Sequence, residues 1–257
     1  MLKLRFVTAL LLAPVVLGAI ALGYWTMLAA TLVAVALAAY ELARALEIPF
    51  PATFGAGALP VLLSVPSGAS GALAGAVLVL PWTLLWLTTR ADAYTLRSIL
   101  ALLLMALWVG TPLAHLALLE GLPGGQFLVL LAVVGPWISD TGAYFVGRLF
   151  GRHKLFPTLS PKKTVEGALG GLLLSILIAG FFAHGFLGFG IAASAVLGAA
   201  ISVFSQAGDF FESALKRLLN LKDLGNFLPG HGGILDRMDS LLFSGPVVYY
   251  LCVMFAP

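Results

Sequence analysis

Long apolar runs alternate with short polar connections along the whole chain. A membrane-spanning helix needs about 20 mostly apolar residues, and nine segments meet that requirement. These segments are 6–22, 25–46, 50–66, 70–90, 96–119, 126–149, 166–184, 187–217 and 239–256. None of them alternates with a period of two, so helices are expected. The third segment is short and is interrupted by Gly55, Gly57 and Pro60, so a re-entrant segment is an alternative there.

Composition supports an integral membrane protein. Hydrophobic residues make up 61% of the 257 residues, and the mean hydropathy is +1.06, whereas soluble domains are about 45–50% apolar. We therefore predict an all-α, polytopic fold in one integral domain, residues 1–257. The apolar runs are rich in Ala, Gly and Ser, which permits close helix packing. Cys252, the one cysteine, excludes an internal disulfide and a multi-cysteine metal site, and is expected to be buried.

The basic residues indicate the orientation. With the N-terminus in the cytoplasm, nine spans place all 14 Lys and Arg residues at cytoplasmic ends and the C-terminus outside. These residues are Lys3, Arg5, Arg44, Arg90, Arg97, Arg148, Arg152, Lys154, Lys162, Lys163, Lys216, Arg217, Lys222 and Arg237. Residues 1–22 could also be a signal peptide, but the long apolar segment that follows favours an uncleaved first span.

Most candidate chemistry lies in the second half of the chain. Asp140 is within the sixth span, where a carboxylate requires a polar cavity or a partner; an ion pair with Arg148 or with another helix is the structural alternative. The loop 159–167 contains Lys162 and Lys163, which suit phosphate oxygens, although an ordinary basic loop would look similar. We expect a turn at Ser160–Pro161 and a helix that begins near Thr164.

Polar residues in the eighth segment share one helix face. Their spacing is three or four residues, and they are Ser202, Ser205, Asp209, Glu212 and Lys216. A solvated stripe explains Glu212 well, but it explains Asp209 poorly, because apolar residues surround Asp209. In the first half, Glu41 and Glu47 are interpreted as solvated residues at a cytoplasmic helix end.

The segment 230–240, GHGGILDRMDS, concentrates charge before the last apolar run. The two glycines after His231 indicate a close backbone approach or a turn with positive φ. Asp236 and Asp239 lie one turn apart at a helix start. Capping explains one of them, but not both together with Arg237 and the glycines. Carboxylates without a Cys/His cluster suit Mg²⁺ or Mn²⁺, and the neighbouring cations suit phosphates. This combination points to phosphoryl or nucleotidyl transfer on a membrane-resident substrate.

The run SALKRLLNLKDLGNFLPGHGGILDRMD, residues 213–239, resembles the signature of the phosphatidate cytidylyltransferases, or CDP-diacylglycerol synthases. SDTGAYFVGRLFGRHK at 139–154 and SPKKTVEG at 160–167 are also similar to that family. The likeness covers residues 139–240, with no departure at a motif position. It implies the reaction of CTP with phosphatidic acid to CDP-diacylglycerol and diphosphate. It further implies Mg²⁺ or Mn²⁺, a monovalent cation such as K⁺, a homodimer, and a site on the cytoplasmic side of the inner (plasma) membrane.

The resemblance also implies roles for individual residues. Residues 1–125 become scaffold helices on the dimer or lipid side, and residues 126–257 become the catalytic helices and loops. The implied catalytic residues are Asp209, Asp236, Lys216 and Asp239, and the implied metal ligands are Asp209, Asp236 and Asp239. The implied substrate-binding residues are Asp140, Ser160, Lys162, Lys163, Glu166, Ser213, Arg217, Lys222, Asp223, His231, Gly232, Gly233 and Arg237.

Three other functions remain open from the residues alone. Intramembrane Asp140 and Asp209 would also suit an ion or proton transporter, although the polar residues gather at one face and no repeat is visible. A polyprenol kinase would share the phosphate chemistry. The CDP-alcohol phosphotransferases also use Asp-rich motifs, but their longer pattern is not found. Nucleic acid is not expected as a partner, because the basic residues follow the membrane topology.

Overall fold

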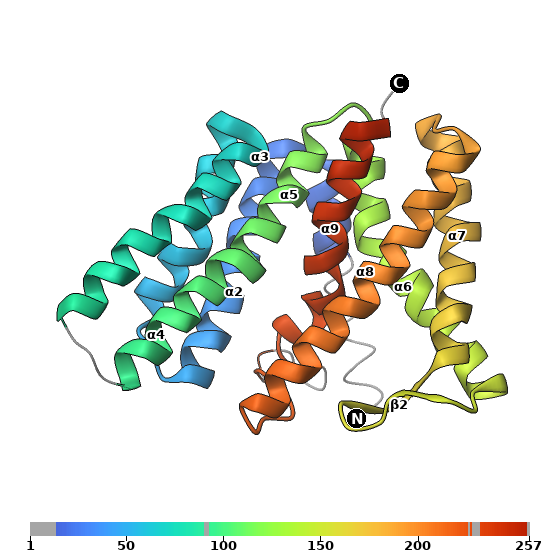
Figure 1. The fold of residues 1–257 in the computed structure, drawn as a ribbon. Coiled ribbons are helices and arrows are strands. Elements are labelled where there is room, and N and C mark those ends of the chain that lie inside the picture. Colours follow the sequence, from blue (N-terminus) through green and yellow to red (C-terminus); the bar gives the residue numbers. More distant parts are fainter. Residues whose placement is uncertain (1–13, 90–92, 226, 228–231, 256–257) are drawn as a thin grey trace. The chain divides into compact units, whose positions relative to one another are not determined.

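The computed structural model describes residues 14–89, 93–225, 227 and 232–255 (Figure 1). Within these residues, seven helices are long and apolar enough to cross a membrane. The chain divides into two compact units. The first combines residues 1–122 with 223–237, and the second combines residues 123–222 with 238–257. The all-α, polytopic class is confirmed at this level, and the roles predicted for the two halves stay predictions.

In the first unit, the helix α3 (Phe50–Thr89) is broken at Gly68, where φ is 61° and ψ is −143°. A Cβ added at Gly71 would meet the carbonyl of Leu63, and one at Gly75 would meet the backbone of Pro60. The two arms of α3 therefore fold back on one another, and they correspond to the third and fourth predicted spans. The first predicted span, residues 6–22, is described only from residue 14 onward, so the total of nine stays a prediction.

Two further long helical stretches belong to the first unit. One is α2 (Tyr24–Leu46). The other runs through α4 (Ala93–Leu104), the π-helical turn η1 (Met105–Gly110) and α5 (Thr111–Glu120). A Cβ at Gly110 would strike the backbone of Gly57. The fifth span thus packs directly against α3, which explains why glycines occur in that weakly apolar part of α3.

The second unit contains α6 (Gly125–Phe150), a hairpin, α7 (Val165–Leu187), α8 (Ile191–Leu218) and most of α9 (Leu235–Phe255). The hairpin consists of β1 (Lys154–Phe156) and β2 (Ser160–Thr164) and joins α6 to α7 (Figure 1). The prediction of a turn at Ser160–Pro161 was wrong, because the turn occupies residues 157–159 and these two residues begin β2. Thr164 does begin the next helix: its Oγ1 accepts a hydrogen bond from the Gly167 N–H, 3.1 Å away.

Small residues bring the helices of the second unit close together. A Cβ at Gly142 in α6 would meet the carbonyl of Gly170 in α7, at 2.7 Å. Between α7 and α8, the Ser175 hydroxyl donates to the carbonyl of Gly198, at 2.7 Å. The predicted close packing through Gly, Ala and Ser is therefore confirmed.

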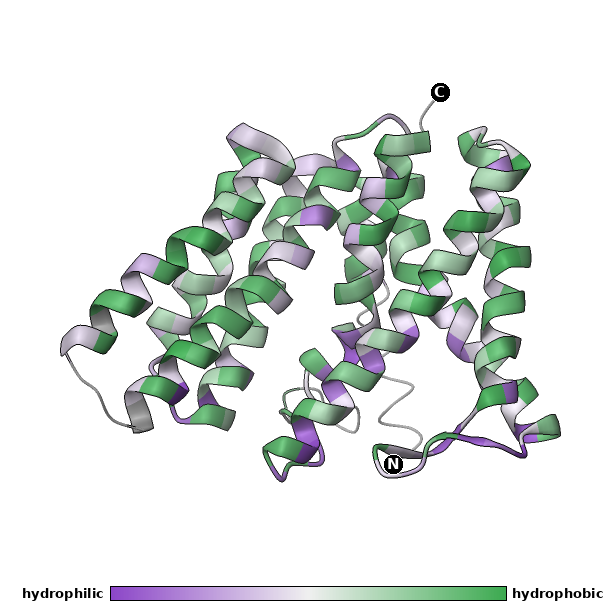
Figure 2. Ribbon diagram, viewed as in Figure 1, coloured by the Kyte–Doolittle hydropathy of each residue, from purple (hydrophilic) through white to green (hydrophobic). Residues whose placement is uncertain are grey.

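The outward faces of these helices are apolar. Leu173, Leu177 and Phe181 repeat every four residues along α7 and are 61%, 67% and 68% exposed, as expected for side chains that contact lipid. The polar residues gather instead at the hairpin and at the last turns of α8 (Figure 2). The helix α8 has 28 residues, about 42 Å at 1.5 Å per residue, and it continues unbroken through Asp209 to Leu218.

Candidate active site

Five predicted site residues form one group at the polar end of the second unit. This group, the Asp209 cluster, consists of Asp140 on α6, Lys163 on β2, Asp209 and Lys216 on α8, and Asp239 on α9. Asp209 forms an ion pair with Lys163. Asp239 is repelled by Asp209 and Asp140 and attracted by Lys216. The hairpin and three helices are thus needed to assemble residues that are up to 99 positions apart in the sequence (140 to 239).

Lys163 is held by two different interactions. Its ammonium pairs with the Asp209 carboxylate, and it also lies 4.5 Å from the centre of the Phe210 ring. The ring of Phe210 in turn packs edge-on against Phe156 of the hairpin, with centroids 4.8 Å apart. The side chains of Lys163 and Asp209 are 30% and 28% exposed. The pair is therefore ordered but accessible to a ligand.

Asp239 reaches the cluster because α8 and α9 touch at a glycine. A Cβ at Gly208 would collide with the backbone carbonyl of Asp239. One turn further on, the rings of Phe211 and Phe243 lie 5.5 Å apart. This contact places the carboxylate of Asp239 close enough to Asp209 for the two charges to repel one another.

Lys216 is paired with a buried carboxylate, which corrects the interpretation of Glu212. Glu212 was interpreted as part of a solvated stripe, but its side chain is only 2% exposed. Its Oε2 lies 2.7 Å from the Lys216 ammonium, one turn along α8. The polar face of α8 is therefore turned toward the protein, and Glu212 is a site-supporting residue that the sequence reasoning missed.

The glycine-rich motif belongs to the first unit. Gly232 has φ of 87°, a left-handed conformation that favours glycine. Gly233 is buried, and its N–H donates to Oδ2 of Asp236 at 2.7 Å. The other oxygen of Asp236 accepts from the Leu224 N–H at 3.4 Å. Both alternatives offered by the sequence are confirmed, since one glycine has positive φ and the other makes a close approach.

Glu41 is the second residue whose surroundings were predicted wrongly. It was interpreted as a solvated helix end, but it is only 3% exposed. Its two carboxylate oxygens accept hydrogen bonds from the backbone N–H groups of Ile234 and Leu235, at 2.8 and 3.1 Å. The sequence offered no clear signal of this burial, since Glu41 follows the exposed Tyr40 and precedes the buried Leu42, while Glu47 is exposed as expected.

The remaining predicted residues lie at the edges of these groups. Glu166 accepts hydrogen bonds from the backbone of Arg152 and His153, at 3.0 and 3.2 Å, so it orders the start of the hairpin. Ser213 donates to Asp209 at 3.4 Å, and Ser160 is half-buried in β2. The exposed members are Lys162, Arg217, Lys222, Asp223 and Arg237. His231 lies outside the described residues.

The donor atoms suit a hard divalent cation, although they do not form a finished cage. Among the described residues, no group of three or more His, Cys, Asp or Glu side chains is arranged to hold a metal ion. Mg²⁺ generally takes one or two carboxylates and completes its shell with water and substrate phosphates. The mutual repulsion of Asp140, Asp209 and Asp239 is what a cation would relieve. The residues therefore fit the metal, which stays a prediction.

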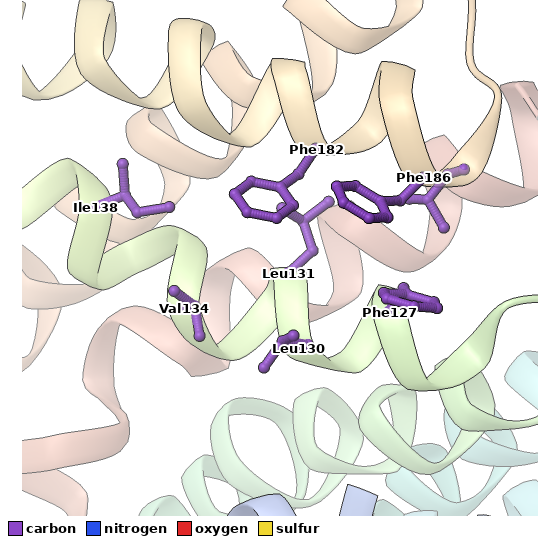
Figure 3. A pocket seen from close by; sticks show the side chains of 8 residues that line it. Phe127, Leu130, Leu131, Val134, Ile138, Phe182 and Phe186 are labelled. Atoms are coloured by element: carbon purple, nitrogen blue, oxygen red, sulfur yellow. The ribbon is translucent and has the colours of Figure 1, made fainter. Parts of the chain in front are cut away.

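A separate pocket lies between α6 and α7 (Figure 3). Its lining is wholly apolar and includes Phe127, Val134, Ile138, Phe182 and Phe186. The rings of Phe182 and Phe186 are stacked with centroids 5.3 Å apart. None of the charged residues described above lines this pocket, so it is not where the phosphate chemistry takes place.

Comparisons with known proteins identify the family of this chain. The model of the cytidylyltransferase family matches residues 3–255. A phosphatidate cytidylyltransferase of Bacillus subtilis (strain 168) is 39% identical over 187 residues, which cover 72% of this chain and 68% of that protein. Proteins of the same name from Staphylococcus saprophyticus and Staphylococcus aureus (strain COL) are 47% and 43% identical over 131 residues. In both cases the match covers 50% of each chain.

Proposed function

The chain belongs to the cytidylyltransferase family and is a nucleotidyltransferase, and from this premise we propose that it transfers the cytidylyl group of CTP to phosphatidic acid. The products are CDP-diacylglycerol and diphosphate. The observation that carries the proposal is the Asp209 cluster, in which carboxylates and lysines meet at the polar end of membrane-length helices. A soluble nucleotide and a lipid phosphate can both reach such a position.

The reaction makes one bond and breaks one. An oxygen of the phosphatidate phosphate attacks the α-phosphorus of CTP, and the bond from that phosphorus to the oxygen bridging it to the β-phosphorus breaks. The nucleophile is already an anion, so no strong general base is required. The main barrier is the repulsion between two polyanions, and cations that are already in place lower it.

The lysines of the cluster supply this charge. Asp209 and the Phe210 ring fix the ammonium of Lys163, and Glu212 fixes that of Lys216. Both ammonium groups are oriented before a substrate arrives, which reduces the entropy lost on binding. We propose that Lys163 and Lys216 bind phosphate oxygens, with Lys162, Lys222 and Arg237 as further exposed cations.

We further propose that Asp209 and Asp239 hold Mg²⁺, or Mn²⁺ in its place, together with water and substrate phosphates. The role of Asp236 as a third ligand stays an expectation from the family resemblance. When bound, the ion supplies Lewis-acid stabilisation of the charge on the phosphoryl oxygens and on the leaving diphosphate. A requirement for K⁺ and a homodimeric assembly are also proposed. The positions of the basic residues support a plasma-membrane protein whose site faces the cytoplasm.

The test is diphosphate release by the purified protein in detergent with CTP, phosphatidic acid and Mg²⁺. Asp209→Asn and Asp239→Asn should each reduce the rate at least about 100-fold, because each removes a charge from the cluster. Glu47→Gln is the matched control, since Glu47 is exposed at the end of α2 and should keep the wild-type rate.

Release that needs both substrates and the metal, and that both cluster variants lose while remaining folded, supports the proposal. If folded wild-type protein releases no diphosphate with both substrates present, the proposed reaction is wrong. Phosphorylation of a polyprenol by CTP would then identify a lipid kinase. Cation flux in vesicles without CTP would identify a transporter.

A further inference from the structure

We propose that Glu41 is a positioning residue for cytidylyl transfer. It fixes the first turn of α9. By fixing that turn, it also holds Asp236 and the Gly232–Gly233 backbone in the arrangement that binds the nucleotide. The inference rests on the function proposed above. Glu41 lies on α2, outside every stretch of sequence that resembles the family signature. All the residues involved belong to the first unit.

The contact between Glu41 and α9 uses the whole carboxylate. Oε1 accepts from the Ile234 N–H at 2.8 Å, and Oε2 accepts from the Leu235 N–H at 3.1 Å. These are two of the N–H groups at the start of a helix that have no partner within it. A negative charge there also interacts favourably with the helix dipole. Among the described residues no cation forms an ion pair with Glu41, and these hydrogen bonds explain how its carboxylate can be buried.

The surrounding backbone is shaped around this carboxylate. A Cβ added at Gly233 would lie 2.5 Å from Oε2 of Glu41, and a Cβ at Gly225 would overlap its carboxylate. The Phe227 backbone N–H also interacts favourably with Glu41. The residues on both sides of the segment 228–231 are thus held by one side chain. The second glycine of the His-Gly-Gly motif is required because Glu41 occupies the space that a side chain would need.

The same backbone carries the predicted metal ligand. Gly233, which packs on Glu41, also donates its N–H to Asp236 at 2.7 Å. Asp236 directly follows Ile234 and Leu235, whose N–H groups bind Glu41. A displacement of the helix start would therefore move Asp236 directly. Capping of α9 alone would not require Glu41, because the Asp236 side chain already accepts a hydrogen bond from the Gly233 N–H just before the helix.

Two substitutions disturb the contact in different ways. Glu41→Gln keeps the shape but replaces one acceptor oxygen with an NH₂ group, which then faces an N–H donor. Glu41→Asp keeps the charge but is one methylene shorter, so it reaches at most one of the two N–H groups. Both should weaken the positioning, whereas a role that depended on charge alone would be preserved by Asp. Glu47→Gln is the matched control, because Glu47 is exposed six residues further along the chain.

The experiment combines three measurements on the full-length protein in detergent. Hydrogen exchange by mass spectrometry reports the amides of Ile234 and Leu235. Equilibrium dialysis with CTP reports nucleotide binding without turnover. Steady-state diphosphate release gives separate KM values for CTP and phosphatidic acid. We expect Glu41→Gln to speed exchange at these amides and to raise both the CTP dissociation constant and the CTP KM about tenfold or more. The phosphatidic acid KM should stay within twofold.

Gly225→Ala is an independent test, because the three atoms nearest to its added Cβ all belong to Glu41. It should give the same defect, and combining it with Glu41→Gln should add little, since both disturb one contact. The inference is overturned if folded Glu41→Gln keeps the wild-type CTP affinity and KM, if both KM values rise equally, or if Glu41→Asp is indistinguishable from wild type. An inactive wild-type protein would overturn the proposed function instead, and dialysis would then show whether Glu41 still governs CTP binding.

Discussion

The buried pair of Glu212 and Lys216 gives a prediction that separates stability from catalysis. Their charged atoms are 2.7 Å apart, with side chains 2% and 16% exposed. At that distance and an effective dielectric constant of 20, the attraction is about 6 kcal/mol. Removing each ion from water costs several kcal/mol, so the net contribution of the intact pair is near zero. The cost appears when one partner is removed and the other stays charged and buried.

Glu212→Gln should therefore destabilise the protein by about 3 kcal/mol. For a chain of this size that corresponds to a Tm roughly 6–12 °C lower, measurable by thermal unfolding in detergent. The double variant Glu212→Leu/Lys216→Met removes both charges, so its Tm should return to within about 3 °C of wild type. It should nevertheless release diphosphate at least about 100-fold more slowly, because the proposed phosphate-binding ammonium of Lys216 is gone.

Two results would refute this reasoning. A Tm for Glu212→Gln within 1 °C of wild type would mean that the pair is not the buried interaction described above. Wild-type turnover by the stable double variant would mean that Lys216 serves only to balance Glu212. Glu47→Gln, an exposed carboxylate in the first unit, should change neither property and serves as the control.

Three further outcomes are expected. Gly208→Val should lower the Tm by several degrees, because its side chain strikes the carbonyl of Asp239; Ala207→Val, on the exposed side of the same turn, should not. Lys163→Met should raise the CTP KM about tenfold, the equivalent of one hydrogen bond to a charged group, whereas the exposed Lys154→Met should stay within twofold. Chelation of divalent cations should abolish diphosphate release, and added Mg²⁺ should restore it; release that persists in excess chelator would exclude the metal role.

The features set by local sequence were predictable. Apolar length located the helices to within a few residues, and the break at Gly68 falls in the gap between the third and fourth predicted spans. Thr164 was recognisable as a helix start, because a cap depends on residues only three positions away. The grouping of Asp140 with Lys163 and Asp209 was not predicted, because the hairpin that carries Lys163 was expected only as a loop.

Two of the three errors concern residues whose surroundings are set by other helices. The spacing of Glu212 placed it on a face with Asp209, but it did not say whether that face contacts water or protein. Glu41 depends on N–H groups 193 and 194 residues away, and backbone donors leave no mark in the amino-acid sequence. The Ser160–Pro161 dipeptide favours a turn locally, but pairing with β1 extends it into a strand.

The discontinuity of the first unit has a consequence for synthesis in the cell. The helix bearing Glu41 is made early, whereas its partners at 234 and 235 follow 193 and 194 residues later. At about 5–20 residues per second, that interval is about 10–40 s. Throughout it the carboxylate must rely on water or on other groups at the membrane boundary. A ribosome that stalls or stops before residue 234 leaves a nascent chain whose spans are nearly complete but whose Glu41 is unsatisfied. Such a chain should be a substrate for membrane quality-control proteases.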